Sequence, residues 1–348
     1  MGAAFRWTKK PGAYTTAFDN GVTDGQLHYR LPRPGGVSRA SWSTDAHARL
    51  IYGDMATPPT GTDRTTPLLR GRVREVFRHL PKALAGEEEP IHQMRVAGRR
   101  LRVALPHLAR RPDGKRVQRA LTELRRLTRA AGASRDYDVM LGLFEERLRG
   151  VRPRSPEQTI LLRRLRGART RSRGRMADAL LDLEIARLRR DLRTVLARRG
   201  ERLFAVLLRL GQTQGAEGGA LLATFETLGA RFDPDALHRL RIRARRLRYA
   251  ADLQAELTRR RNAAPEILKE LQERLGDIRD QFLMSVWLGT QTRAAQERGQ
   301  LALAAEAHRL ETVFLQASHA LHRALLEHDP VARLGEALKA MGQQRPAA

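Results

Sequence analysis

Apolar residues recur every three or four positions from Pro67 to the end of the chain, and no stretch shows the alternation of a strand. This periodicity predicts an all-α fold. Four prolines fall at or just inside predicted helix starts, where proline costs least, and Asp113 and Asp233 are predicted N-caps. Helices are expected at about 68–84, 90–110, 115–131, 135–149, 157–182, 184–198, 220–229, 234–258, 264–276, 279–298, 300–327 and 331–341.

Two stretches lack this periodicity. Residues 1–65 are rich in Gly, Pro, Ser and Thr, and we interpret them as a flexible extension or as translated sequence upstream of the true start. The stretch from Gly211 to Gly219 is interpreted as a plain connector between helices. The helical region then covers residues 66–345, with repeat halves at about 68–198 and 220–345.

An internal repeat organises the helical region. The segment from His92 to Leu105, HQMRVAGRRLRVAL, aligns without a gap to the segment from His238 to Ala251, HRLRIRARRLRYAA. Some 40 residues later, the Gly-x-x-Arg-Asp motif ending at Asp136 matches the one ending at Asp280. Two elements repeated in the same order indicate a duplication.

Each repeated segment predicts a helix with one apolar and one basic face. In the first copy, the basic residues follow steps of 3, 4 and 3 and fall within an arc of about 80°. Neither basic face contains an acidic residue, although like charges at this spacing destabilise a helix. Arginine also suits bidentate contact with phosphoryl oxygens, so we expect both faces to bind an anion. We call them the basic stripes: His92, Arg95, Arg99 and Arg102, and His238, Arg241, Arg245 and Arg248.

Other charged residues occupy duplicated positions. Arg125 aligns with Lys269, one predicted helix before the Arg-Asp motif, and both are expected to face the same groove. The pairs Arg135–Asp136 and Arg279–Asp280 have two interpretations: they cap a helix start or anchor a neighbouring arginine, or they orient the stripes from behind. The two stripe histidines are expected to donate hydrogen bonds to the anion.

Charge and composition narrow the function. The 348 residues contain 65 Lys and Arg against 38 Asp and Glu, a net charge of +27, which indicates a polyanionic partner. The absence of cysteine excludes disulfides, thiolate metal sites and cysteine nucleophiles. No phosphate-binding loop, no His-Glu-x-x-His motif and no carboxylate cluster is present, so we expect no cofactor, no metal and no catalysis. No apolar run suits a membrane span or a secretory signal, and we expect a cytoplasmic protein.

The duplicated motif resembles the CHAD family, the conserved histidine α-helical domain. The resemblance covers residues 66–345 and includes the Leu247-Arg248-Tyr249 ending of the second copy. It implies two four-helix bundles related by a pseudo-two-fold axis, whose basic helices line a central channel that binds inorganic polyphosphate. By position, the anion ligands are the eight stripe residues, with Arg125 and Lys269 behind them. Gly98 departs from an ideal helix and costs about 1 kcal/mol in helix propensity.

The sequence therefore favours a non-catalytic polyphosphate-binding protein, associated with polyphosphate granules in a bacterial cell. The alternative is a general nucleic-acid or nucleoid binder, for which the charge alone would be sufficient. A third reading is an accessory of polyphosphate metabolism with phosphohydrolase activity. The stripes contain almost no aromatic residues for stacking single strands, which favours the first interpretation.

Overall fold

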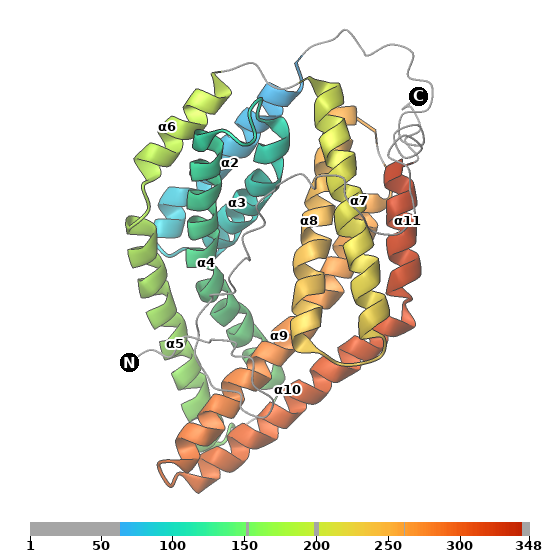
Figure 1. Ribbon diagram of the computed structural model, residues 1–348. Helices are drawn as coiled ribbons and strands as arrows, with labels where there is room; N and C mark the ends of the chain where they lie inside the picture. Colours follow the sequence, from blue (N-terminus) through green and yellow to red (C-terminus); the bar gives the residue numbers. More distant parts are fainter. Residues whose placement is uncertain (1–62, 151–152, 198–201, 261, 343–348) are drawn as a thin grey trace. The chain divides into compact units, whose positions relative to one another are not determined.

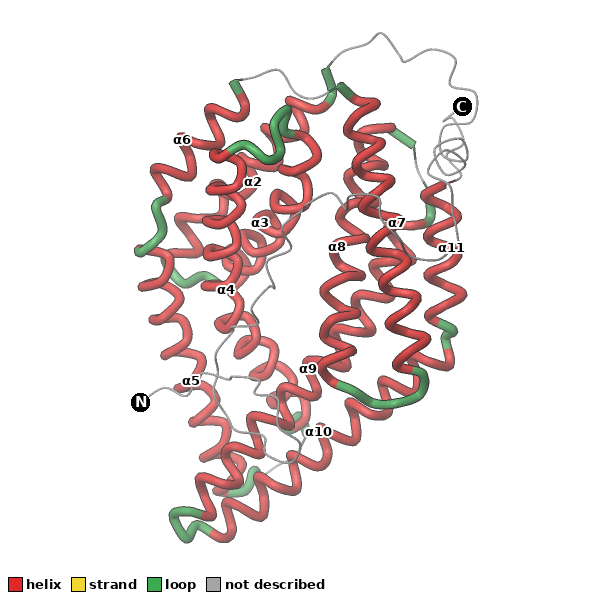
Figure 2. The backbone as a smooth tube through the Cα atoms, in the orientation of Figure 1, coloured by secondary structure: helices red, strands yellow, loops and turns green. Residues whose placement is uncertain are grey.

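The computed structural model describes residues 63–150, 153–197, 202–260 and 262–342, all within one compact unit, Ala48–Ala348. Across these residues the secondary structure is helical and contains no strand, which confirms the all-α class (Figures 1 and 2). The predicted extension lies outside the described residues except for 63–65. The helices are α2 Thr65–Leu84, α3 Glu88–Leu108, α4 Lys115–Arg147, α5 Pro156–Leu181, α6 Ile185–Leu196, α7 Leu203–Leu228, α8 Pro234–Thr258, α9 Ala264–Gln296, α10 Leu301–Glu327 and α11 Pro330–Gly342.

Most helix starts follow the signals in the sequence. Helices α5, α8 and α11 begin at Pro156, Pro234 and Pro330. The Asp233 carboxylate accepts hydrogen bonds from the backbone N–H of Asp235 and Ala236, so the predicted cap of α8 is confirmed. The predicted cap at Asp113 is wrong, because α4 begins after Gly114, which provides no side-chain cap.

Three predicted interruptions are wrong. Helix α4 runs unbroken through the predicted boundary near Gly132, and α9 runs unbroken through Gly276, so each replaces two predicted helices. The supposed connector from Gly211 to Gly219 lies inside α7. A Cβ added at Gly218 would stand 2.5 Å from the Leu338 Cδ2 of α11. This glycine therefore marks a close approach between two helices and not a break in one.

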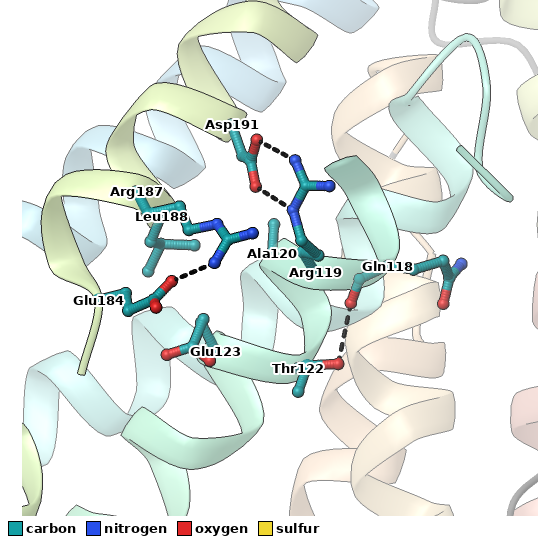
Figure 3. Close-up of a pocket in the computed structure, with 9 residues that line it drawn as sticks. All are labelled: Gln118, Arg119, Ala120, Thr122, Glu123, Glu184, Arg187, Leu188 and Asp191. Atoms are coloured by element: carbon teal, nitrogen blue, oxygen red, sulfur yellow. Dashed lines mark hydrogen bonds and ion pairs between the residues drawn. The ribbon is translucent and has the colours of Figure 1, made fainter. Parts of the chain in front are cut away.

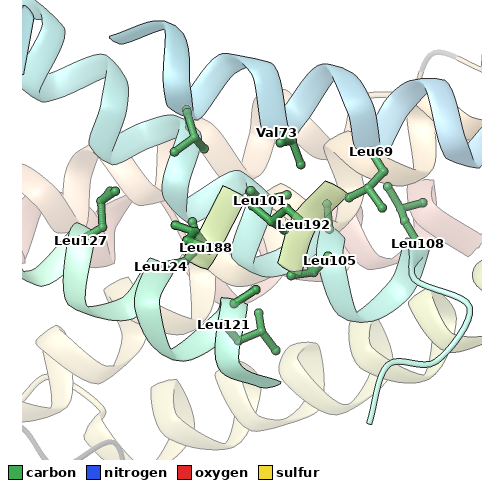
Figure 4. Close-up of a cluster of buried hydrophobic side chains, with 14 of the residues drawn as sticks. Leu69, Val73, Leu101, Leu105, Leu108, Leu121, Leu124, Leu127, Leu188 and Leu192 are labelled. Atoms are coloured by element: carbon green, nitrogen blue, oxygen red, sulfur yellow. The ribbon is translucent and has the colours of Figure 1, made fainter. Parts of the chain in front are cut away.

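The first half forms a four-helix bundle. Helices α2, α3, α4 and α6 pack around a core of leucine side chains, of which Leu101, Leu124 and Leu192 are at most 1% exposed (Figure 4). Truncation of such a leucine to alanine costs about 2–5 kcal/mol, so this core is a major source of stability. Helix α5 lies outside this ring and packs along α4.

The second half repeats this arrangement. Helices α7, α8, α9 and α11 pack around a second core that includes Leu240, Leu268 and Leu334, and α10 packs along α9. The helices of the two halves also follow the same order, with 33 residues in both α4 and α9. The second half begins with α7 at Leu203, earlier than the predicted residue 220, because the glycines of α7 were interpreted as a connector. The pseudo-two-fold axis stays a prediction.

The two halves are joined on both sides of the stripes. At one end Leu210 and Leu257 of the second half enter the core of the first, and Arg209 donates to the His107 carbonyl at 2.7 Å. At the other end α4 packs against α9 and α5 against α10, and Gln158 donates to Glu306 at 2.9 Å. These contacts fix α3 beside α8.

Candidate anion-binding site

The basic stripes lie where α3 and α8 meet. The apolar face of α3 enters the first core through Met94, Leu101 and its neighbours, and that of α8 enters the second core through Leu240, Leu247 and their neighbours. The opposite faces carry the stripes, and α3 contacts α8 directly. The packing of each apolar face therefore turns the arginines of the two halves toward one another.

Arginines from the two stripes influence one another across this contact. The pKa of Arg95 is lowered to about 10 and that of Arg245 to about 9; burial is the largest cause for both, and the charge of Arg241 contributes to both. Burial also holds the pKa of Arg99 well below its usual value, with Arg95 and then Arg245 as the next causes. Guanidinium groups of both halves thus form one mutually repelling cluster, in which Arg95 is buried and Arg99 and Arg245 are half-buried.

Only part of this cluster has polar partners in the protein. Arg102 donates to Thr128 Oγ1 at 3.2 Å, and Arg248 at the equivalent position donates to Gln272 Oε1 at 3.3 Å. Arg95 donates to the Gly132 carbonyl at 3.4 Å. The Nε of Arg95 and the Nε of Arg241 are buried without a hydrogen-bond partner.

Arg99 and Arg245, at the middle of the stripes, are the least compensated. Among the described residues, no carboxylate lies within 4.0 Å of either guanidinium group, and neither group makes a hydrogen bond. Half-buried cations without counter-ions are unfavourable, so this position has the chemistry of an anion site.

The stripe histidines also lie among these cations. Burial lowers the pKa of His238 to about 4, with Arg279, Arg241 and Arg245 contributing and Asp136 opposing. Burial likewise lowers the pKa of His92, followed by the charge of Arg135. Both imidazoles are therefore neutral in the free protein near neutral pH, and each retains one N–H that can donate to an anion.

The Arg-Asp motifs lie in the middle of α4 and α9, so the capping interpretation is wrong. Arg279 donates to both oxygens of Asp136, at 2.9 and 3.3 Å, and also to Asp280 at 3.3 Å. Asp136 in turn lies 3.9 Å from Arg95 Nη1. The first motif differs, because Arg135 pairs with Glu88 at 3.1 Å on the outside of the bundle. The second-copy arginine and the first-copy aspartate thus hold the stripes from behind.

The positions of Arg125 and Lys269 in the structure differ from the prediction. Arg125 and Lys269 lie on α4 and α9, the same helices as the Arg-Asp motifs, because each pair of predicted helices is one helix. Arg125 is exposed. Lys269 pairs with Glu266 at 2.7 Å, and Arg248 is near enough to oppose the resulting rise in its pKa. Neither residue joins the cluster.

One residue of the cluster was missed as a site residue in the sequence. Tyr249 is 7% exposed, and its ring centroid lies 5.9 Å from the guanidinium carbon of Arg100 and 5.7 Å from that of Arg248. Its phenol group also affects the pKa of Arg99, Arg241 and Arg245. The available signal was that Tyr249 is the only Phe, Trp or Tyr in the two repeated segments, with Val103 at the equivalent position.

A separate pocket of about 250 Å³ lies between α4 and α6 (Figure 3). Its lining includes Arg119, whose guanidinium donates to both oxygens of Asp191 at 2.8 and 3.0 Å, and Arg187, which pairs with Glu184 at 2.7 Å. The arginines of this pocket already have carboxylate partners, and no stripe residue lines it. It is therefore distinct from the anion site.

The described part of the chain lacks the features of a metal site and of a membrane span. There, no group of three or more His, Asp or Glu side chains is arranged to hold a metal ion. Over the same residues, every helix is too short or too polar to cross a bilayer. The arrangement at α3 and α8 is suited to holding a polyanion through guanidinium, imidazole and phenol donors.

Comparison with known proteins agrees with the family that the repeated motif indicates. Residues 67–289 match the CHAD domain family. Two uncharacterized proteins of Mycobacterium tuberculosis, MT2285 of strain CDC 1551 and Rv2226 of strain H37Rv, are each 28% identical over 228 residues. That segment covers 61% of this chain and 42% of each relative, so the chain spans less than half of their length.

Solved structures show the same fold. The crystal structure of the CHAD domain from the plant Ricinus communis aligns with a TM-score of 0.56 at 24% identity, over 78% of this chain and 90% of that one. PptA from Streptomyces chartreusis aligns with a TM-score of 0.55 at 16% identity, over 76% and 98%. The duplicated histidine and arginine motif, the helical fold and the match over residues 67–289 together show that this chain belongs to the CHAD family.

Proposed function

We propose that this protein binds inorganic polyphosphate, without turning it over, between the two basic stripes. The observation that supports the proposal most strongly is the cluster around Arg99 and Arg245, where half-buried guanidinium groups from both halves meet without carboxylate partners among the described residues. A polymer with a negative charge on every phosphate would replace this repulsion with attraction.

Several arginines on the outside of the protein do have carboxylate partners. Arg187, Arg309 and Arg333 each pair with a glutamate three residues away at 2.7 Å. These three exposed arginines have counter-ions within the chain, whereas Arg99 and Arg245 at the middle of the stripes have none among the described residues. This contrast favours a dedicated site over a diffuse basic surface.

The burial of the cluster favours a slender polymer. Arg95 is only 8% exposed, and the halves are joined at both ends of the stripes. A linear phosphate chain carries no base or sugar and needs far less room than a nucleic-acid duplex. Polyphosphate is thus a better fit to the stripes than nucleic acid. The central channel implied by the family resemblance is part of this proposal.

The absence of catalysis is also part of the proposal. Hydrolysis of a phosphoanhydride requires an activated nucleophile or a bound metal. The two stripe imidazoles have arginines as their main electrostatic neighbours, and among the described residues neither imidazole is hydrogen-bonded to a hydroxyl or a carboxylate. A cytoplasmic location near polyphosphate granules follows from this binding role.

The experiment compares two double variants of equal charge. Arg99→Glu with Arg245→Glu lowers the net charge by four, from +27 to +23. The matched control is Arg293→Glu with Arg323→Glu, at two exposed positions of α9 and α10. We expect the stripe variant to lose polyphosphate binding by at least about 100-fold and the control to change less than about three-fold.

The measurement is the Kd for long-chain polyphosphate across a salt series, with orthophosphate release followed in the presence of Mg²⁺. Equal losses in the two variants would show a diffuse electrostatic binder and refute the stripe site. Release of orthophosphate that disappears in His92→Ala or His238→Ala would refute the non-catalytic role.

A further inference from the structure

The excess positive charge is divided unequally between the two halves. Residues 63–200 contain 36 basic and 16 acidic residues, a net charge of +20, whereas residues 201–348 contain 22 and 18, a net charge of +4. Each half contributes three arginines to the stripes. These three account for most of the excess in the second half but leave a net charge of +17 in the first. Because the duplicated stripes need equal charge from both halves, they do not explain this surplus.

Part of the surplus lies on the outer face of α2 and α6. These helices pack together, and the Arg189 guanidinium of α6 lies 4.7 Å from the centre of the Phe77 ring of α2. Arg70 and Arg74 precede Phe77 by seven and three residues and so share its side of α2. We define the α2–α6 basic face as six exposed arginines: Arg70, Arg74, Arg78, Arg189, Arg190 and Arg193.

This face is poorly compensated by the protein itself. Of its six arginines, Arg78 alone has a carboxylate within 4.0 Å among the described residues, namely Glu75 at 3.7 Å. The pairs Arg70–Arg74 and Arg189–Arg193 stand four residues apart on their helices, a spacing at which like charges destabilise a helix. The face therefore maintains an unfavourable arrangement that an external anion would relieve.

The chemistry of the face identifies a phosphate backbone as the partner. Exposed arginines bind phosphate oxygens well, and neither α2 nor α6 contains the Asn or Gln side chains that read adenine edges. Contacts of these arginines to phosphate oxygens should then be independent of base sequence. A lipid surface fits less well, because Leu188 and Leu192, the apolar side of α6, are 1% exposed and already packed in the core.

We propose that the α2–α6 basic face binds the phosphate backbone of duplex nucleic acid, at a site separate from the stripes. The first half then carries a surface that the second half lacks, and the chain can hold a duplex on its outside while the stripes remain open. This inference does not require any particular ligand in the stripes.

The test uses the full chain and a fluorescein-labelled DNA duplex of arbitrary sequence, with anisotropy measured across a salt series. The face variant is Arg74→Glu with Arg193→Glu, compared with the stripe variant Arg99→Glu with Arg245→Glu and the control Arg293→Glu with Arg323→Glu. All three have a net charge of +23. We expect the face variant to bind duplex at least about ten-fold more weakly, with a salt slope smaller by about two.

Polyphosphate binding should be unchanged in the face variant and duplex binding unchanged in the stripe variant. The proposal is overturned if the wild type does not bind duplex, if all three variants weaken alike, or if the stripe variant alone loses duplex. Loss of polyphosphate but not of duplex in the face variant would also overturn it. The milder pair Arg74→Gln with Arg193→Gln, checked for an unchanged melting temperature, repeats the test without charge reversal. Failure of the stripes to bind polyphosphate would count against the proposed function and leave this result standing.

Discussion

Arg279 of α9 donates hydrogen bonds to both carboxylate oxygens of Asp136 of α4. This contact joins the two halves of the chain directly behind the stripes. Burial raises the pKa of Asp136, but Arg279 and then Arg95 more than reverse this and hold it well below its usual value. Asp136 is therefore the carboxylate that allows two buried guanidinium groups to lie close together.

Replacing Asp136 with asparagine should destabilise the protein by about 3 kcal/mol, since it leaves buried arginines without their charge partner. Chemical denaturation of the wild type and Asp136→Asn gives the difference directly. The control is Glu336→Gln, which removes an exposed partner of Arg333 and should cost less than about 1 kcal/mol. Equal effects of the two substitutions would show that the buried contact has no special role.

The helical fold and the stripes could be predicted because both depend on local periodicity. The apolar positions of α3 and α8 define the core side of each helix, and the duplicated arginines then fall on the opposite side. The starts of helices at proline and after Asp233 could be predicted for the same reason, because a proline or a capping side chain acts within one helical turn.

The packing role of the glycines could not be predicted from the sequence, because it depends on distant residues. Gly218 is explained by Leu338 of α11, and Gly98 by the Thr128 Cγ2 of α4, which would stand 2.8 Å from an added Cβ. In both cases a side chain of a neighbouring helix occupies the space that a Cβ would fill. The glycine lowers the helix propensity but allows the two helices to pack closely. The pairing of Arg279 with Asp136, 143 residues apart, was likewise invisible in the sequence because only the tertiary fold brings them together.

The repulsion between the stripes predicts a conflict between stability and binding. Arg245→Met removes a half-buried cation and keeps an apolar side chain of similar length, so the free protein should become more stable by about 1 kcal/mol. The same variant should bind polyphosphate more weakly. Thermal unfolding with and without polyphosphate measures both effects. A decrease in the stability of free Arg245→Met would contradict the idea that this arginine is strained, and exposed Arg323→Met serves as the neutral control.

The stripe histidines predict that binding is linked to proton uptake. The pKa of His238 is about 4 in the free protein and about 6.5 when unfolded, so the unfolded state binds more protons between these values. The stability of the free protein should therefore fall as pH is lowered from about 6.5 to 4. A bound anion raises the pKa of both imidazoles, so affinity for polyphosphate should increase as pH falls from about 8 to 6.

Calorimetric titrations in buffers with different heats of ionisation would measure this uptake. His92→Gln with His238→Gln should reduce the uptake and flatten the pH dependence of Kd. If the double variant takes up as many protons on binding as the wild type, groups other than the two stripe histidines are responsible for the proton uptake.

Tyr249 should contribute one hydrogen bond to a bound anion, and replacement with phenylalanine should reveal it. Arginine side chains have no acceptor atoms, so the phenol proton has no acceptor among the guanidinium groups that surround it. A phosphoryl oxygen would provide one, and hydrogen bonds to charged groups are worth about 1.5–3 kcal/mol. Tyr249→Phe should thus weaken polyphosphate binding about ten-fold while leaving the melting temperature nearly unchanged, because the ring still lies beside Arg100 and Arg248. Tyr249→Leu, which removes the ring as well, should lower both affinity and stability. An unchanged Kd in Tyr249→Phe would show that the hydroxyl does not reach the anion and that Tyr249 acts only by packing against the arginines.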